Sequence, residues 1–283
     1  MDRTTESPPE SWRWALAWER SFNVPAGRRL LGLFSLVRGL GAFALITLSV
    51  MVRKAGVARG VIQPLIFKEL LRSGWRLLPM TLFFAVALGL VVIGQTVTLL
   101  SQVGANEYLG AIMASVVVRE LGPLLTVLLV LLRVGTANVV ELGTARALGE
   151  VEAIEAMSID PIHYLVVPRV IGMALGVFTL TVYLILGALL SGYLWAFLRD
   201  VALLPGAYFE QLAAALGWID FALLALKTVT FGAIIAVVTC YHGLARPLTL
   251  TEVSSATVRA VSQGFVLCVM ADGLFLIAYL LVQ

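Results

Sequence analysis

Long blocks of apolar residues constrain this chain more than any other feature of its sequence. A helix that crosses a bilayer needs roughly 18 or more largely apolar residues in a row. Only 13% of the 283 residues are charged, against about 25% in a soluble domain, which is too few to cover a water-facing surface. The pattern predicts an all-α integral membrane protein with five transmembrane helices, at residues 77–100, 109–143, 170–198, 221–241 and 264–282.

Basic residues are concentrated ahead of the first apolar block. Twelve of the 20 Lys and Arg residues precede residue 77. A basic segment can bind nucleic acid, but this one has no recognisable reading motif, and beside membrane spans positive charge marks the cytoplasmic face. We therefore expect no nucleic-acid partner and a cytoplasmic amino terminus. Five crossings then place the carboxyl terminus on the outer, periplasmic face.

The segment before the first block divides into an arm and interfacial helices. Residues 1–27 are polar and predict a loose cytoplasmic arm without a cleavable signal peptide. Residues 28–76 predict interfacial helices. Within them, residues 30–52 are long enough to cross the bilayer, but Arg38 interrupts them and basic residues flank both ends, which favours an interfacial or re-entrant helix over a crossing. Residues 77–283 form the five-span domain.

The loop between the second and third blocks predicts a short amphipathic helix at about residues 145–161. Apolar residues recur there at near-helical spacing, glutamates stand between them, and Asp160-Pro161 stops the helix. The helix could be a connector on the membrane surface or a docking helix for a soluble partner. Docking is favoured because an acidic helix gains nothing from an anionic inner leaflet. The candidate docking residues are Glu150, Val151, Glu152, Ile154, Glu155, Met157 and Asp160, with Leu148 on the apolar face.

Charged residues inside the apolar blocks are the next candidates, because a charge in hydrocarbon needs a partner or water. Arg119 and Glu120 are adjacent, so they point about 100° apart on a helix and do not form a simple pair. They either anchor the outer interface or form a polar gate or headgroup contact. Arg133 lies deeper, and we expect it to pair within the bundle. Lys227 and Asp272 either neutralise each other, or Lys227 extends to the outer interface.

Sequence motifs of nucleotide-binding, hydrolytic and metal sites are missing from the sequence. There is no G-x-x-x-x-G-K-[ST] phosphate loop, no G-x-S-x-G elbow, no H-E-x-x-H and no Cys/His cluster. His163 and His242 stand alone near predicted helix ends and are expected to be solvated or interfacial, and Cys240 and Cys268 are expected to be buried. We therefore predict no catalytic residue, no metal site and no cofactor bound by this chain.

A series of motifs follows in one order from the second block onward. It consists of Arg119-Glu120-Leu121-Gly122-Pro123-Leu124-Leu125-Thr126, Arg133-Val134-Gly135, Glu141-Leu142-Gly143-Thr144, Asp160-Pro161 and Val166-Val167-Pro168-Arg169. Gly94-Gln95, residues 255–261 and Asp272 fit the same series. From about residue 60 to the end, the chain closely resembles the MlaE-type (YrbE-like) permease family, the membrane subunits of MCE-linked ABC transporters that move phospholipid.

The resemblance implies a function and a set of partners. It implies a homodimer of five-span subunits in the inner membrane, each with an amino-terminal interfacial helix. Two cytoplasmic ATPase subunits would dock on the loop after the second span and use ATP there, so that residues 145–161 are the coupling helix. An MCE-domain protein on the outer face would exchange phospholipid with the permease. The alternatives are a secondary transporter or channel without an ATPase, and a membrane-embedded enzyme, for which no catalytic constellation is visible.

The first span is the predicted lipid path, because in a homodimer the cavity must be lined by a span that faces its symmetry mate. It carries no charge between Leu77 and Leu100, which suits acyl chains, and its outer end is polar. Arg119 and Glu120 would contact the headgroup at the mouth. The predicted lipid-path residues are Ala87, Leu88, Val91, Val92 and Gln95.

Overall fold

A computed structural model describes residues 25–54, 59–104, 108–198, 205–245 and 248–282. Most of the predicted arm, residues 1–24, lies outside the described residues. The chain separates into two compact units, residues 1–46 and 47–283, and each is described by itself. The described part is helical throughout and contains no strand, as the sequence predicts.

A single helix, α2 (Pro25–Arg53), covers the segment predicted to be interfacial or re-entrant. It runs through Arg38 without a break, and its side chains are described from Val37 onward. The helix is therefore as continuous as the apolar run that encodes it. Its placement at the membrane surface, rather than across the bilayer, stays a prediction.

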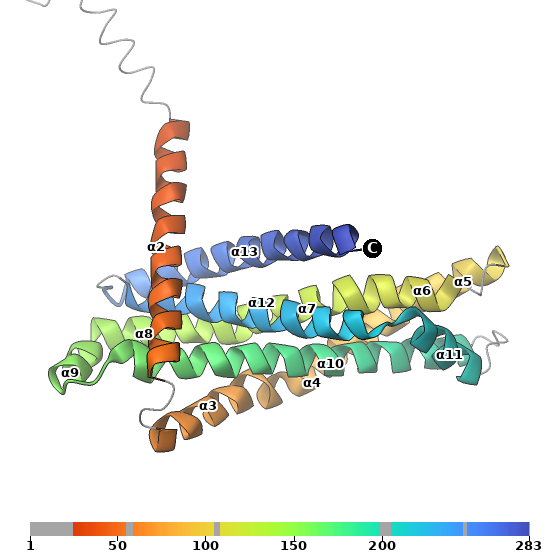
Figure 1. The fold of residues 1–283 in the computed structure, drawn as a ribbon, viewed down its shortest axis with the longest axis horizontal. Coiled ribbons are helices and arrows are strands. Elements are labelled where there is room, and N and C mark those ends of the chain that lie inside the picture. Colours follow the sequence, from red (N-terminus) through yellow and green to blue (C-terminus); the bar gives the residue numbers. More distant parts are fainter. Residues whose placement is uncertain (1–24, 55–58, 105–107, 199–204, 246–247, 283) are drawn as a thin grey trace, which may run out of the picture. The chain divides into compact units, whose positions relative to one another are not determined.

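Five helical segments of the second unit are long and apolar enough to cross a bilayer, which agrees with the predicted number. Figure 1 shows them side by side, with the short helix α9 (Glu150–Ala156) at one end and α11 (Pro205–Ala215) at the other. Each span is longer than its apolar block, because the helices continue into polar residues at their ends. The spans cover Gly60–Gln102, Gly110–Ala147, Ile162–Leu198, Trp218–Leu244 and Glu252–Leu281.

Several spans are assembled from pieces of different helical geometry. The first and second spans contain wide π-helical turns, and the third begins with one, η6 (Ile162–Val166). The fourth and fifth spans are α12 (Trp218–Leu244) and α13 (Glu252–Val282). The pieces of the first span are α3 (Arg59–Ser73), η1 (Trp75–Leu77), α4 (Leu78–Leu88), η2 (Gly89–Ile93) and α5 (Gly94–Gln102). Those of the second are α6 (Leu109–Met113), η4 (Ala114–Leu121), α7 (Gly122–Val130), η5 (Leu131–Gly135) and α8 (Thr136–Ala147).

Helix α10 (Val167–Leu198), the body of the third span, lies at the centre of the packing and contacts α3, α4, η2, α7 and α12. Small residues permit the close approach. A Cβ on Gly192 would lie 2.5 Å from Ile93 Cβ, and one on Gly172 would lie 2.6 Å from Glu69 Cβ. Any side chain at these positions would push the first span away from α10.

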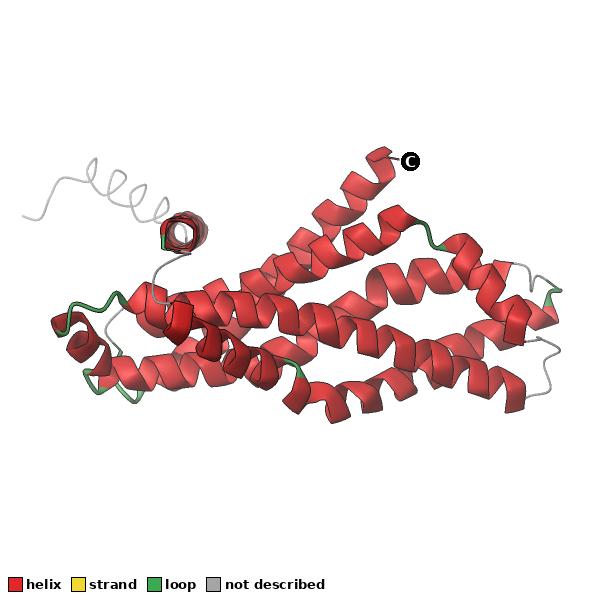
Figure 2. Cartoon of the chain, turned by 60° about the horizontal axis from the view of Figure 1, so that its bottom comes forward, coloured by secondary structure: helices red, strands yellow, loops and turns green. Residues whose placement is uncertain are grey.

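Helix α13 is the least buried of the spans. In its most apolar stretch 11% of the residues are buried, against 39% to 56% in the other four spans. Figure 2 shows its last turns standing away from the neighbouring helices. Large apolar side chains are exposed on it, among them Val266, Met270, Leu274 and Leu280. This flank therefore needs lipid or another protein to cover it.

Candidate functional site

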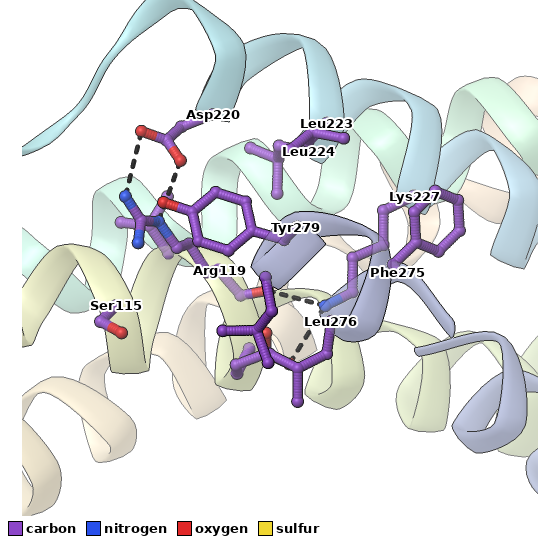
Figure 3. Close-up of a pocket in the computed structure, with 12 residues that line it drawn as sticks. Ser115, Arg119, Asp220, Leu223, Leu224, Lys227, Phe275, Leu276 and Tyr279 are labelled. Carbon is purple, nitrogen blue, oxygen red and sulfur yellow. Dashed lines mark hydrogen bonds and ion pairs between the residues drawn. The ribbon is translucent and has the colours of Figure 1, made fainter. Parts of the chain in front are cut away.

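Arg119 and Asp220 form an ion pair between the second and fourth spans, at the α11 end of the bundle. Arg119 Nε lies 2.9 Å from Asp220 Oδ1, and Arg119 Nη2 donates a hydrogen bond of 3.2 Å to Oδ2. The Nη2 contact is a hydrogen bond and the Nε contact an ion-pair contact, so two nitrogens of the guanidinium face the carboxylate. The guanidinium also lies 4.6 Å from the centre of the Tyr279 ring on α13. Arg119 thereby connects three spans (Figure 3).

Lys227 is the centre of a second, more buried group of charges. Its side chain is 7% exposed, and its Nζ lies 2.6 Å from Asp272 Oδ1 and 3.1 Å from Glu120 Oε2. Nζ also donates a hydrogen bond of 2.9 Å to the backbone oxygen of Arg119. This confirms the alternative in which Lys227 and Asp272 neutralise each other.

Pro123 explains why Lys227 reaches a backbone oxygen. A proline within a helix has no N–H to offer to the carbonyl four residues earlier, and that carbonyl belongs to Arg119. The wide turns of η4 directly precede this point. A carbonyl inside a bilayer needs a donor, and Lys227 supplies it. The Arg119-Glu120-Leu121-Gly122-Pro123 motif thus supplies a backbone acceptor for Lys227 as well as two charged side chains.

These charges line a cavity of about 260 Å³ between the second, fourth and fifth spans. Two cations (Arg119 and Lys227) and two carboxylates (Glu120 and Asp220) line it, so the lining is formally neutral, and Asp272 binds Lys227 without lining the cavity. The lining combines charged groups with apolar side chains (Figure 3), which suits an amphiphile. Its volume is below the roughly 300–1,000 Å³ of sites that enclose drug-sized ligands, so it fits a headgroup and not a whole phospholipid. The lining residues are Ser115, Val118, Arg119, Glu120, Asp220, Leu223, Leu224, Lys227, Phe275, Leu276, Tyr279 and Leu280.

Asp220 is the site residue that the sequence reasoning did not find. It lies in the first turn of α12, and its Oδ2 also accepts a hydrogen bond of 2.9 Å from the N–H of Gly217. An acidic residue in the first turn is ordinarily read as a helix cap. The available signal was the unpaired Arg119 at the same predicted depth.

The predicted lipid-path residues do not share one face of the first span. Leu88 is 8% exposed and belongs to a core cluster with Ile93, and Val92 packs against that cluster. Val91 is 56% exposed, Gln95 is exposed and Ala87 is half-buried. A lipid path along this span therefore has Val91 and Gln95 on its wall, with Leu88 behind it.

A network of four charges joins the first three spans near the α9 end. Glu141 Oε2 on α8 lies 2.7 Å from Arg72 Nη1 on α3 and 3.2 Å from Arg169 Nη2 on α10. Glu69 Oε1 lies 3.7 Å from both arginines. The network links α3 to the α9 end of the second span, nine residues before α9 begins.

Helix α9 is shorter than predicted. Helix α8 continues to Ala147, and Gly149 has a positive φ of 76°, which glycine adopts at little cost and which separates the two helices. Val151 is buried and Ile154 half-buried, whereas Leu148 and Met157 are exposed, so the four apolar residues do not form one face. Glu150, Glu152 and Glu155 are exposed. Arg146 Nε lies 3.2 Å from Glu152 and its Nη1 4.0 Å from Glu155.

Asp160 closes the loop after α9. Its Oδ2 accepts a hydrogen bond of 2.6 Å from Lys54 Nζ, and its Oδ1 accepts bonds from the N–H groups of Ile162 and His163 at 3.0 and 3.4 Å. Partial burial by itself raises the pKa of the carboxyl, but these donors outweigh it and the net pKa lies below its ordinary value. Asp160 is thus both the predicted helix stop and an anchor for Lys54.

Arg133 differs from the expectation that it would pair within the bundle. Its side chain is exposed on the second span, in η5, and no ion pair joins it to another described residue. The neighbouring Thr136 hydroxyl is occupied by backbone oxygens, donating 2.7 Å to Leu132 and 3.3 Å to Arg133.

Comparison with known proteins gives one consistent set of relatives. A family model described as permease MlaE matches residues 66–278. A probable ABC transporter permease protein of Rickettsia prowazekii is 32% identical over 214 residues, which cover 74% of this chain and 80% of the relative. A protein of Synechocystis with the same description is 34% identical over 185 residues, or 64% and 67% of the two chains. The intermembrane phospholipid transport system permease protein MlaE of Haemophilus influenzae is 25% identical over 246 residues, covering 85% and 90%.

Proposed function

The chain belongs to the MlaE permease family and is the membrane permease subunit of an ABC transporter, and from this premise we propose that it moves phospholipid between the inner membrane and an outer-facing MCE partner, powered by a separate ATPase. The observation that carries the lipid assignment is the cavity lined by Arg119, Lys227 and Tyr279. Its lining combines charged groups with leucines, as a headgroup with attached acyl chains requires. The phospholipid in the printed name of the Haemophilus influenzae relative supports the same substrate class.

Within this proposal, the headgroup sits at the charged cavity, where Arg119 can interact with phosphate. Val91 and Gln95 of the first span face away from the core and would guide the acyl chains.

Exposed parts of the second unit support the proposed partners. The acidic residues of α9 are exposed and available to a basic groove of an ATPase. The exposed side of the first span, with Val91 and Gln95, is available to a second copy of the chain, as a homodimer with facing first spans requires. In this arrangement the α9 end is cytoplasmic and the α11 end faces the MCE partner.

A second candidate is a secondary transporter that works without an ATPase. The observation in its favour is the buried Lys227–Asp272 pair with the half-buried Glu120 beside it, since carboxylates paired within a membrane are also used to couple transport to protons.

Transport in proteoliposomes separates the two candidates. The chain, copurified with any P-loop ATPase that stays bound, is reconstituted with a phospholipid that carries a fluorophore on its headgroup. The rate at which the fluorophore becomes accessible to a quencher is then measured with ATP and with an imposed pH gradient. We expect acceleration by ATP, lost in Arg119→Gln and kept in Glu210→Gln, which changes an exposed charge at the same end of the bundle. A response to the pH gradient alone would favour the secondary transporter, and a wild-type rate in Arg119→Gln would remove the cavity from the lipid path.

A further inference from the structure

Arg133 is an exposed cation inside a membrane span, and no described residue forms an ion pair with it. Its depth follows from the helix rise of 1.5 Å per residue. Glu120 lies 13 residues away toward the α11 end, about 20 Å along the axis, and Glu141 lies eight residues away toward the α9 end, about 12 Å. The charged network of Glu141, Arg72 and Arg169 marks the α9-side edge of the hydrocarbon core, which is roughly 30 Å thick. Arg133 therefore lies well inside the hydrocarbon, in its α9-side half.

No carboxylate of this chain is available at that depth within the described part of the bundle. Glu120 and Glu141 are the acidic residues of the second span itself. Glu120 is bound to Lys227, and Glu141 is bound to Arg72 and Arg169.

The neighbouring spans have no acidic residue at this level either. Leu131 abuts Gly264 of α13, Gly135 abuts Thr239 of α12, and Asn138 Nδ2 lies 3.1 Å from Met173 Sδ of α10. These contacts place Arg133 level with residues 260–264, 235–239 and 173–177, none of which is acidic. In the first span the corresponding level is near Leu77, which belongs to one core cluster with Leu131 and Val134, and residues 77–81 are also free of acidic side chains.

A second copy of the chain would not supply the missing carboxylate. Two copies in one membrane with the same orientation are related by an axis along the membrane normal, so each residue keeps its depth in both. At the depth of Arg133 the second copy would also have no acidic residue, and it would add a second arginine.

We propose that Arg133 binds the phosphate of a phospholipid drawn from the α9-side leaflet. A guanidinium presents five donors in a planar fork that matches phosphate oxygens, and it carries its charge at any working pH. An arginine at this depth lowers its energy by directing its head toward the nearer interface and by pulling headgroups and water inward. Val140, two turns toward the α9 end, is 45% exposed, and Glu141 beyond it is half exposed, so the path from Arg133 to the interface is open along this side of the helix.

The site is distinct from the charged cavity at the α11 end and belongs to the opposite leaflet. The proposal requires only that the second span crosses a bilayer, and it does not depend on which substrate the protein transports.

Headgroup-directed photolabelling tests the proposal. The chain is reconstituted in phosphatidylcholine vesicles that contain a phosphatidylethanolamine with a diazirine on its headgroup, and labelled residues are mapped by mass spectrometry. An ordinary lipid headgroup stays at the interface and labels the protein near Glu141 and beyond. We expect additional labelling of residues 132–137 in the wild-type protein. In Arg133→Gln this labelling should decrease about tenfold, the effect of losing one charge-assisted contact, and Arg133→Lys should keep most of it.

Leu132→Gln is the matched control, because it places the same amide one residue away, on a side chain that is 50% exposed, and leaves the cation in place. It should be labelled like the wild-type protein. Equal labelling of residues 132–137 in the wild-type and Arg133→Gln proteins would overturn the proposal. So would a wild-type pattern confined to the interface, a result that depends on no variant. Efficient disulfide formation between two copies of Arg133→Cys would also overturn it, since the position would then face protein.

Discussion

Single residues in this protein are constrained by how few polar groups the bilayer tolerates. Lys227 satisfies two carboxylates and the carbonyl that Pro123 leaves without a donor. Asp220 both caps α12 and holds Arg119. Each of these side chains therefore has a structural role in addition to any contact with substrate, and the two roles have to be separated by experiment.

Lys227→Met is expected to destabilise the protein strongly. The substitution leaves Asp272 buried and Glu120 half-buried without their cation, and breaking a buried pair from one side costs about 3–5 kcal/mol. The double variant Lys227→Met, Asp272→Leu removes both members of the buried pair and should recover much of the loss. The melting temperatures of the detergent-purified proteins measure this, and a double variant less stable than Lys227→Met would contradict it.

Leu88→Asp and Val91→Asp are expected to fail in different ways. Leu88 packs in the core, so a carboxylate there should prevent folding, whereas Val91 is 56% exposed and its variant should fold. If Val91 lines the lipid path, the folded variant should lose phospholipid transport. Yield of monodisperse protein and transport rate are the two readouts. A well-folded Leu88→Asp protein would show that this side chain is not part of the core.

At the scale of helices, the number of helices could be predicted from the sequence better than their lengths and their buried faces. The number of spans was predictable because hydrocarbon requires continuous helices. The buried face of the first span was not, because Leu88, Val91 and Val92 are all apolar and the pattern does not distinguish core from lipid. The length of α9 depended on the left-handed Gly149, which an apolar spacing rule ignores. Asp220 was missed because its capping role gave it a sufficient explanation.

Charge reversal on α9 tests its proposed docking role. Glu150→Lys with Glu155→Lys places two cations on an exposed acidic helix, and we expect the ATPase to be lost from the purified complex while membrane insertion is kept. Glu210→Lys on α11 is the control, since it makes the same chemical change on an exposed residue at the other end of the bundle. Recovery of the complex at wild-type levels from the double variant would remove α9 from the interface.

The Lys54–Asp160 pair should contribute to stability in a pH-dependent way. The pKa of Asp160 is lowered in the folded protein, so the pair stabilises it above the ordinary carboxyl pKa of about 3.9 and loses this effect as the pH falls through the lowered value. Both side chains are partly exposed, so the contribution should stay below about 1 kcal/mol. Asp160→Asn should therefore melt slightly earlier than the wild-type protein at pH 7. An equal difference at pH 3 would exclude the pair as its cause.

The whole molecule has two chemically different ends that five spans keep apart. The α9 end carries the acidic helix and the Glu141 network, and the α11 end carries the cavity of Arg119 and Lys227. In the proposed transporter the ATPase acts on one face and the MCE partner on the other, and two different ends would serve this arrangement. Which face each end occupies is then the decisive property of the complete subunit.

Thiol labelling in intact cells is expected to assign the two faces. In a background with Cys240 and Cys268 replaced by serine, Gln283→Cys follows the fifth span and Met157→Cys lies exposed at the end of α9. If residues 30–52 do not cross and the α9 end is cytoplasmic, an impermeant reagent should modify Gln283→Cys in intact cells and Met157→Cys only after permeabilisation. The reverse pattern would mean that the subunit is inverted, as it would be if α2 were a sixth crossing and the amino terminus stayed cytoplasmic. Protection of both positions would mean that one of the three spans between them does not cross the membrane.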